Sequence, residues 1–239
     1  MPTQAPMPQN RLLLALPRKD LNHLHQDLED VDCPYRHVLV EADSPLEHVY
    51  FPDKGVVSVL AVYPDGNSIE MATIGREGAT GFQAVLGAKI SSARLLVQIS
   101  GRAHRMSRVA FDRALQDVVS FRSLMFAHVH ALLEQVLISS ACNAAHGVRQ
   151  RLARWLLMMR DRHDEDTLPI TQDLIAEMLG VYRPSVTNAV RSLERRGLIE
   201  VGRKRVSLLD HEGLSEASCE CYQMVRMRTA QHLPKTYPT

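Results

Sequence analysis

The chain has little that would mark it as a secreted or membrane-spanning protein. Only four of its 239 residues are cysteine, too few and too scattered for a disulfide framework in a chain of this size. Uncharged stretches such as Gln135–Val148 fall short of the roughly 20 residues that a bilayer requires. The apolar run Leu12–Leu16 is shorter than the core of a typical signal peptide. We therefore expect a cytoplasmic, reduced protein with no membrane partner.

The net charge is also small, but the charged residues are unevenly distributed along the chain. The formal charge is only +1, and the hydrophobic fraction of 45% and charged fraction of 23% are ordinary for a globular protein. Residues 1–146 sum to −2, whereas residues 147–239 sum to +3. The segment Arg183–Arg205 alone holds seven basic and two acidic residues. The basic charge is therefore local, and its role has to be sought within that segment.

Proline is missing from residues 65–168, whereas eight of the twelve prolines lie in residues 1–64. Because interior proline breaks helices, the proline-free stretch can hold long ones. Before residue 104, short runs of β-branched and apolar residues predict strands at 38–40, 48–51, 56–62 and 95–99. Turn signals at 53–55 and 64–67 separate them. Many short strands at this spacing predict an antiparallel barrel or roll.

Two helices are predicted to follow. Ser107 is a candidate N-cap for a short helix through Leu115, and Ser120 for one of about 25 residues. The long helix has two apolar stripes, one for the strand domain and one for a second copy of the chain. The alternative is a helix buried within its own chain. The residues we assign to the dimer contact are Phe121, Met125, Val129, Leu132 and Val136. Gly147 then interrupts the pattern and is predicted to be a hinge between two domains.

The most specific pattern lies in residues 170–209. Thr171 begins a short amphipathic helix that Gly180 ends, and a second helix begins by Pro184. Ala176, Gly180 and Val186 have the spacing of a helix-turn-helix: a small residue, a tight turn and a buried valine. Predicted strands at 198–201 and 206–209 flank a hairpin tip with three basic residues. This combination predicts a winged helix.

The outward face of the second helix and the hairpin tip carry side chains suited to nucleic acid. Arginine pairs with guanine and asparagine with adenine in the major groove, and basic or hydroxyl side chains bind phosphate. We predict base contacts from Arg183, Ser185 and Asn188. Phosphate contacts are predicted for Thr171, Thr187, Arg191, Arg195, Arg203, Lys204 and Arg205. The alternative is a ligand-sensing module whose winged helix docks on another protein.

In this order of parts, the chain resembles the cyclic AMP receptor protein/FNR (Crp/Fnr) family of bacterial transcriptional regulators. The resemblance covers roughly residues 12–225. Its most specific motifs are VRQRLARWLLMMRDR at 148–162, the segment 171–201 and the glycine-rich IGREGATGF at 74–82. It implies an α+β fold with an N-terminal antiparallel β-roll, similar to cyclic-nucleotide-binding domains, a long dimerisation helix and a C-terminal winged helix-turn-helix.

The resemblance also implies boundaries and partners. The expected parts are a β-roll sensor domain at 12–118, a dimerisation helix at 119–146, a winged-helix DNA-binding domain at 147–225 and a tail at 226–239. The expected partners are double-stranded DNA, a second copy in a homodimer and, for an activator, RNA polymerase. One departure affects base reading, because Arg183 is followed by Pro184 where many relatives have glutamate.

The chain departs further from the family where cyclic nucleotides bind. Relatives hold the ribose with a Gly-Glu pair and the phosphate with an Arg-Ser pair. The matching positions here are Gly81-Phe82 and Ser91-Ser92, which offer neither the carboxylate nor the positive charge. Cyclic AMP is therefore not expected as the effector. A pocket for an unidentified effector would involve Gly75, Gly78, Gly81, Phe82, Ser91, Ser92 and Arg94.

No metal, cofactor or catalytic site is expected. Cys33 stands alone in the first 140 residues, which excludes the family's N-terminal [4Fe–4S] cluster. Cys219 and Cys221 offer half of a zinc site, but four ligands are needed and there is no second cysteine pair. His211 and Cys33 could complete it, yet a structural role is favoured. Whether Cys142, Cys219 or Cys221 has a redox role stays open. No enzyme motif is present.

Overall fold

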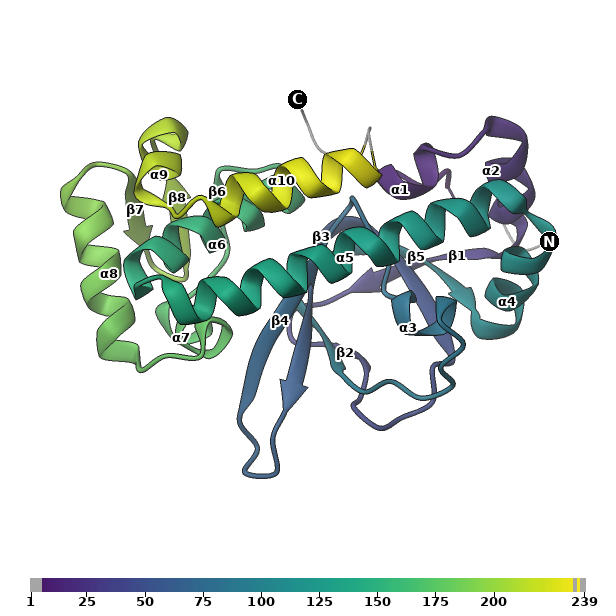
Figure 1. Cartoon of the computed structure of the whole chain (residues 1–239), viewed down its shortest axis with the longest axis horizontal. Coiled ribbons are helices and arrows are strands. Elements are labelled where there is room, and N and C mark those ends of the chain that lie inside the picture. Colours follow the sequence, from purple (N-terminus) through teal and green to yellow (C-terminus); the bar gives the residue numbers. More distant parts are fainter. Residues whose placement is uncertain (1–5, 234–235, 237–239) are drawn as a thin grey trace.

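The computed structural model describes residues 6–233 and residue 236. Figure 1 shows a strand-rich N-terminal part and a helical C-terminal part, with one long helix running across both. The N-terminal part consists of α1 (Arg11–Leu14), α2 (Arg18–Leu24), η1 (His25–Asp27), β1 (Leu28–Cys33), β2 (Val38–Val40), β3 (His48–Val62), β4 (Ser68–Ile74), α3 (Phe82–Val85), β5 (Arg94–Ser107) and α4 (Arg108–Asp117). The rest consists of α5 (Val119–Ala145), α6 (Val148–His163), β6 (Thr167–Leu168), α7 (Gln172–Leu179), α8 (Arg183–Arg195), β7 (Ile199–Gly202), β8 (Arg205–Leu208), α9 (His211–Ala217) and α10 (Cys221–His232).

The strands of the N-terminal part form the antiparallel sheet of the roll. Their order is β1-β5-β3-β4, and β2 also pairs with β5. The two strands predicted at 48–51 and 56–62 are one strand, β3, and the turn predicted between them is wrong. Gly55 has a φ of +89° at a register shift, and a Cβ there would lie 2.5 Å from the carbonyl oxygen of Ile99. The glycine therefore permits a bulge within the strand.

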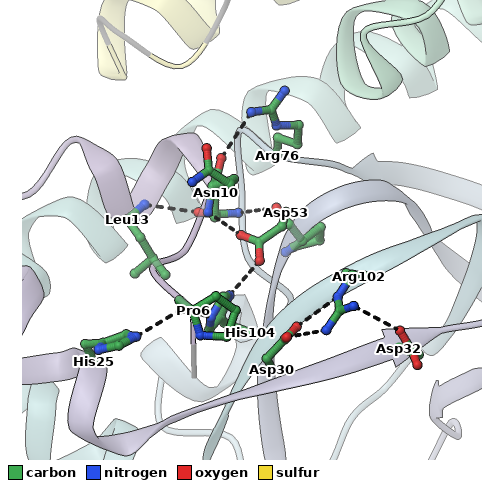
Figure 2. A network of polar contacts seen from close by, with 12 residues as sticks. Pro6, Asn10, Leu13, His25, Asp30, Asp32, Asp53, Arg76, Arg102 and His104 are labelled. Atoms are coloured by element: carbon green, nitrogen blue, oxygen red, sulfur yellow. Dashed lines mark hydrogen bonds and ion pairs between the residues drawn. The ribbon is translucent and has the colours of Figure 1, made fainter. Parts of the chain in front are cut away.

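Hydrogen bonds of buried polar groups hold the N-terminal segment against the roll (Figure 2). The Asn10 amide nitrogen donates to the carbonyl oxygens of Pro52, at 2.8 Å, and Gly78, at 2.9 Å. His104 contacts Asp53 through Nδ1 at 2.6 Å, while its Nε2 lies 2.8 Å from the carbonyl oxygen of Pro6. Burial alone would lower the pKa of His104, but Asp53 outweighs it and raises that pKa. These contacts close one side of the roll.

Helix α5 has about the predicted length, with 27 residues, but begins before its expected cap. The Ser120 hydroxyl donates to Asp20 at 2.6 Å and does not cap the helix, because α5 already starts at Val119. By length and composition α5 could cross a membrane. It is nevertheless attached to the roll through polar contacts, since the Gln135 amide donates to the carbonyl oxygen of Thr73 at 3.2 Å. We interpret it as a helix that joins two domains.

The C-terminal part begins at Gly147, which precedes α6 as predicted. Strand β6, which the sequence did not indicate, joins β8 and β7 in a three-stranded sheet. The apolar core of this part extends onto the roll and includes Val56 and Leu60 of β3 and Ile138 of α5. Helix α10 then runs back along α5 and carries residues 226–232, which the sequence assigned to a tail (Figure 1). The two parts therefore share one packed interface.

Candidate nucleic-acid interface

Helices α7 and α8 form the predicted helix-turn-helix. The Thr171 hydroxyl accepts from the backbone N–H of Leu174 at 3.2 Å and caps α7. Gly180 ends α7 with a φ of +61°, and the N–H of Val181 donates to the carbonyl oxygen of Ala176 at 3.1 Å. The inner face of α8 buries Val186, Ala189, Val190 and Leu193. Burial of that face fixes which side chains of α8 point outward.

The outward face of α8 carries the side chains predicted to read bases. Arg183 and Asn188 are exposed, and Ser185 is half-buried between them along the helix. The guanidinium of Arg183 lies beside the exposed carboxylate of Asp173, with Nε 2.8 Å from Oδ1. This ion pair joins the first turns of α7 and α8. Further along α8, Arg191 and Arg195 are also exposed and continue the basic surface.

The two threonines predicted to bind phosphate have partners within the fold. Thr187 donates to the side-chain oxygen of Gln172 at 2.9 Å, which links α8 to α7. Thr171 is engaged as the cap of α7. Their contacts with phosphate remain predictions, and the structure gives both residues a role in holding the two helices.

The wing is a tight hairpin with an exposed basic tip. Arg203, Lys204 and Arg205 are all exposed, and Gly202 pairs with Arg205 across the turn. Lys204 has a φ of +59°, a conformation that glycine adopts more cheaply than lysine. The Glu194 carboxylate accepts from the backbone N–H of Val201 at 3.1 Å. This hydrogen bond fixes the wing relative to α8.

One exposed residue at this surface was missed by sequence reasoning. Tyr182 is 87% exposed at the N-terminus of α8. Large exposed aromatic side chains are a feature of binding surfaces, because they lose little conformational entropy on contact. The available signal was an aromatic residue between Gly180 and Pro184, in a turn where the apolar pattern of the helices required none.

The glycine-rich loop predicted to line an effector pocket packs against helices. A Cβ on Gly78 would lie 2.7 Å from the ring of His128 in α5, and one on Gly75 would lie 2.6 Å from Arg162 in α6. Burial lowers the pKa of His128. A cavity between β4, α5 and α10 measures about 20 Å³. That is room for about one water molecule, far less than a nucleotide needs.

The other predicted pocket residues bond locally. The Ser91 hydroxyl lies 2.7 Å from the carbonyl oxygen of Ala93 and also contacts Gln83, whose amide nitrogen donates to Ser92 at 2.9 Å. Arg94 donates to Glu41 at 2.7 Å at the surface. Gly81 precedes the short helix α3, which begins at Phe82. The structure therefore brings Ser91 and Ser92 together near α3 and directs Arg94 to a surface carboxylate.

Helix α5 buries most of the stripe that was assigned to a dimer contact. Phe121, Met125 and Leu132 are buried, and Val129 and Val136 are half-buried. Beyond its first turn, the large exposed apolar residues of α5 are instead Phe126 (51% exposed), Leu133 (53%) and Leu137 (57%). Their spacing of seven and four residues places these three on one face of the helix.

Comparisons with known proteins agree with this architecture. A family model for the Crp-like helix-turn-helix domain matches residues 150–217. The transcriptional regulator SdrP of Thermus thermophilus is 26% identical over 179 residues, covering 72% of this chain and 84% of SdrP. The CRP-like cAMP-activated global transcriptional regulator of Mycobacterium tuberculosis is 25% identical over 201 residues, covering 80% of this chain and 89% of that protein.

Solved structures share the fold over most of the chain. FixK2 from Bradyrhizobium japonicum superposes with a TM-score of 0.69 at 16% identity, covering 80% of this chain and 98% of FixK2. The order of roll, long helix and helix-turn-helix is that of Crp/Fnr structures. The matched Crp-like helix-turn-helix domain, the curated relatives and the exposed basic face of α8 together support a DNA-binding transcriptional regulator similar to those of the Crp/Fnr family.

Proposed function

We propose that the protein acts as a homodimer that reads a two-fold symmetric DNA site. Helix α8 of each copy would enter a major groove, and the wing would contact the flanking phosphates. The observation that carries this proposal is the exposed face of α8, with Arg183, Ser185 and Asn188 along it and the basic wing beside it. The two helices would lie about 34 Å apart, one turn of DNA.

The dimer would form along α5 through its exposed apolar face. Phe126, Leu133 and Leu137 are large side chains left open to solvent, and a second α5 supplies a matching stripe. This face replaces the stripe that the sequence indicated, because Phe121, Met125 and Leu132 already pack within the chain.

The roll would act as a sensor or scaffold that biases the geometry around Gly147. We propose that its effector, if it has one, is not cyclic AMP, since Phe82 and Ser91 replace the groups that hold that nucleotide in relatives. The protein would be cytoplasmic and without catalytic activity, and RNA polymerase would be a partner if it activates transcription.

Selection of bound fragments from a random DNA pool, at near-physiological salt and with no added nucleotide, tests this function. We expect an enriched two-fold symmetric site with half-sites about 10 base pairs apart. Retention that is weak, salt-sensitive and independent of sequence would contradict an effector-free reader of DNA. Absence of DNA affinity would instead favour the alternative, a winged helix that docks on protein.

A further inference from the structure

Three cysteines and a histidine from distant parts of the sequence meet where α5 ends. Cys142 and His146 lie four residues apart at the C-terminus of α5, Cys219 lies in the link between α9 and α10, and Cys221 begins α10. The ligating atoms of the four side chains all lie within 4.8 Å of one another. All three cysteines are buried, and His146 is half-buried.

The separations within this cluster are those of a tetrahedral metal site. Zinc bonds thiolate sulfur at about 2.3 Å and imidazole nitrogen at about 2.0 Å, so tetrahedral ligands lie about 3.8 Å (S to S) or about 3.5 Å (S to N) apart. The Cys142 and Cys219 sulfurs are 3.4 Å apart, and the Cys221 sulfur is 3.7 Å from Nδ1 of His146. Three sulfurs and one nitrogen form a complete ligand set for structural zinc.

The surroundings of the cluster also suit a bound metal. Nδ1 of His146 faces the sulfurs, while Nε2 lies 3.3 Å from the carboxylate of Glu220. A carboxylate on the outer nitrogen fixes the orientation of a metal-binding histidine and increases its basicity. Because Glu220 lies between Cys219 and Cys221, the same short link would supply two ligands and their outer support.

Two buried arginines lie near the cluster. Arg151 and Arg154 are each at least nine-tenths buried, and neither forms an ion pair with a carboxylate among the described residues. The Nε atoms of both have no hydrogen-bond partner there. An uncompensated buried cation is costly. Three thiolates around one Zn²⁺ carry a net charge of −1, which would offset part of that cost.

We propose that Cys142, His146, Cys219 and Cys221 bind a single structural Zn²⁺ ion. Binding would release the three thiol protons to solvent, so that the affinity for zinc falls as the pH falls. The ion would tie the end of α5 to the α9–α10 link on either side of Gly147. It would thereby hold the winged helix in a fixed orientation relative to the dimer helix.

Metal analysis of the full-length protein, purified under reducing conditions from zinc-supplemented cells, tests the site directly. We expect about one zinc per chain, with X-ray absorption showing three sulfur ligands at about 2.3 Å and one nitrogen at about 2.0 Å. Removing the zinc with a chelator should lower the thermal midpoint, and adding Zn²⁺ back should restore it. Protein that contains no zinc and takes up none, including protein with a Cys142–Cys219 disulfide, would overturn the proposal.

Three single-residue variants test which side chains bind the zinc, so that the result does not depend on one substitution that could disturb folding. Cys142→Ser and His146→Ala should each lose most of the bound zinc. Cys33→Ser is the matched control, because Cys33 is also buried but lies in β1 of the roll, and it should keep about one zinc per chain. Equal zinc content in all three variants would refute the assignment. The DNA affinity of each variant is measured separately, so failure of the zinc site and failure of DNA binding remain distinguishable.

Discussion

Glu70 is one of the residues that form polar contacts between the roll and the winged-helix part. It lies on β4, and Oε1 of its carboxylate accepts from the indole N–H of Trp155 in α6 at 2.8 Å. Oε2 accepts from the Ser58 hydroxyl at 2.7 Å. Desolvation raises the pKa of Glu70 to about 7, although these two hydrogen bonds act to lower it. A carboxyl group at the contact between two domains thus titrates near neutral pH.

We predict that this group makes stability fall as the pH rises. The folded protein keeps the Glu70 proton between the ordinary pKa of 4.5 and the raised pKa of about 7, where the unfolded chain has lost it. The contribution of Glu70 to the free energy of unfolding is therefore largest below pH 4.5. It declines by about 3 kcal/mol between pH 4.5 and pH 7 and levels off above that. Urea unfolding at several pH values, followed by the fluorescence of the single tryptophan, measures this slope.

Glu70→Gln provides the control for that prediction. Glutamine has nearly the same size and keeps a carbonyl oxygen that can accept from Trp155, but it does not titrate. The variant should show a smaller decline in stability between pH 5 and pH 8 than the parent protein. An unchanged slope would mean that other groups cause the dependence.

The predicted base contact of Arg183 can be tested at the same scale. Arg183→Ala should cost about 1–3 kcal/mol of affinity for the selected site and relax the preference at one base pair per half-site. Competition binding with single-base variants of the site measures both effects. Arg113→Ala, which removes an exposed arginine of the roll, is the matched control and should bind as the parent does. If Arg183→Ala lowered the DNA affinity equally for all sequences, Arg183 would contact a phosphate rather than a base.

Among the helices and strands, the sequence predicted those features that neighbouring residues determine. The helix-turn-helix, the wing and the break at Gly147 follow from turn residues and apolar spacing, and the structure confirms each of them. The bulge at Gly55 was mistaken for a turn, because glycine with a positive φ serves both and only the pairing with β5 separates them. In the same way, periodicity shows two stripes on α5 but not which one packs within the chain, and the burial of Phe121, Met125 and Leu132 identifies that stripe.

The cysteine cluster shows the limit of sequence spacing more clearly. Cys142 and Cys219 are 77 positions apart, and the chain between them has to return to the end of α5 to bring them together. The sequence showed Cys219 and Cys221 as half of a site, and the other half could not be recognised because one partner is a histidine at the end of a helix. Tyr182 was missed for a simpler reason, as exposure of one side chain in a turn is a tertiary property.

The wing allows a prediction that separates folding from binding. Lys204→Gly should stabilise the protein by about 1 kcal/mol, since glycine accepts the positive φ without steric cost. It should also weaken DNA binding and reduce the slope of log affinity against log salt by about 1, because one phosphate contact is lost. Thermal unfolding and salt-dependent DNA titrations measure the two effects.

Lys204→Gln is the matched variant for this test. It removes the charge but leaves a side chain at the same φ, so that DNA binding should weaken as it does in the glycine variant while stability stays near the parent value. If both variants bound DNA as tightly as the parent, the wing would not contact phosphate.

In the molecule as a whole, the order of the parts places α5 where it can connect the roll to the winged helix. Helix α5 is the element that contacts the roll, α10 and the proposed partner chain, and it ends at the cysteine cluster beside Gly147. A shift of the roll against α5 would therefore reach α8 through the packed interface of α6 with β3 and α7 with β4. Such coupling requires that these contacts have two alternative arrangements. In the proposed dimer, the arrangement of one copy would influence the arrangement of the other.

The proposed dimer is accordingly the assembly whose loss should remove function most completely. Leu137→Glu places a charge on the exposed apolar face of α5, and the proposed symmetric contact would bring two such charges together. We expect sedimentation analysis to show a monomer at concentrations where the parent is a dimer, with folding unchanged because Leu137 is 57% exposed. Val109→Glu is the control, since Val109 is 78% exposed on α4, away from that face, and should leave the dimer intact. If the Leu137 variant still sedimented as a dimer, the two copies would have to meet through another surface. The exposed apolar face of α5 would then need a different partner.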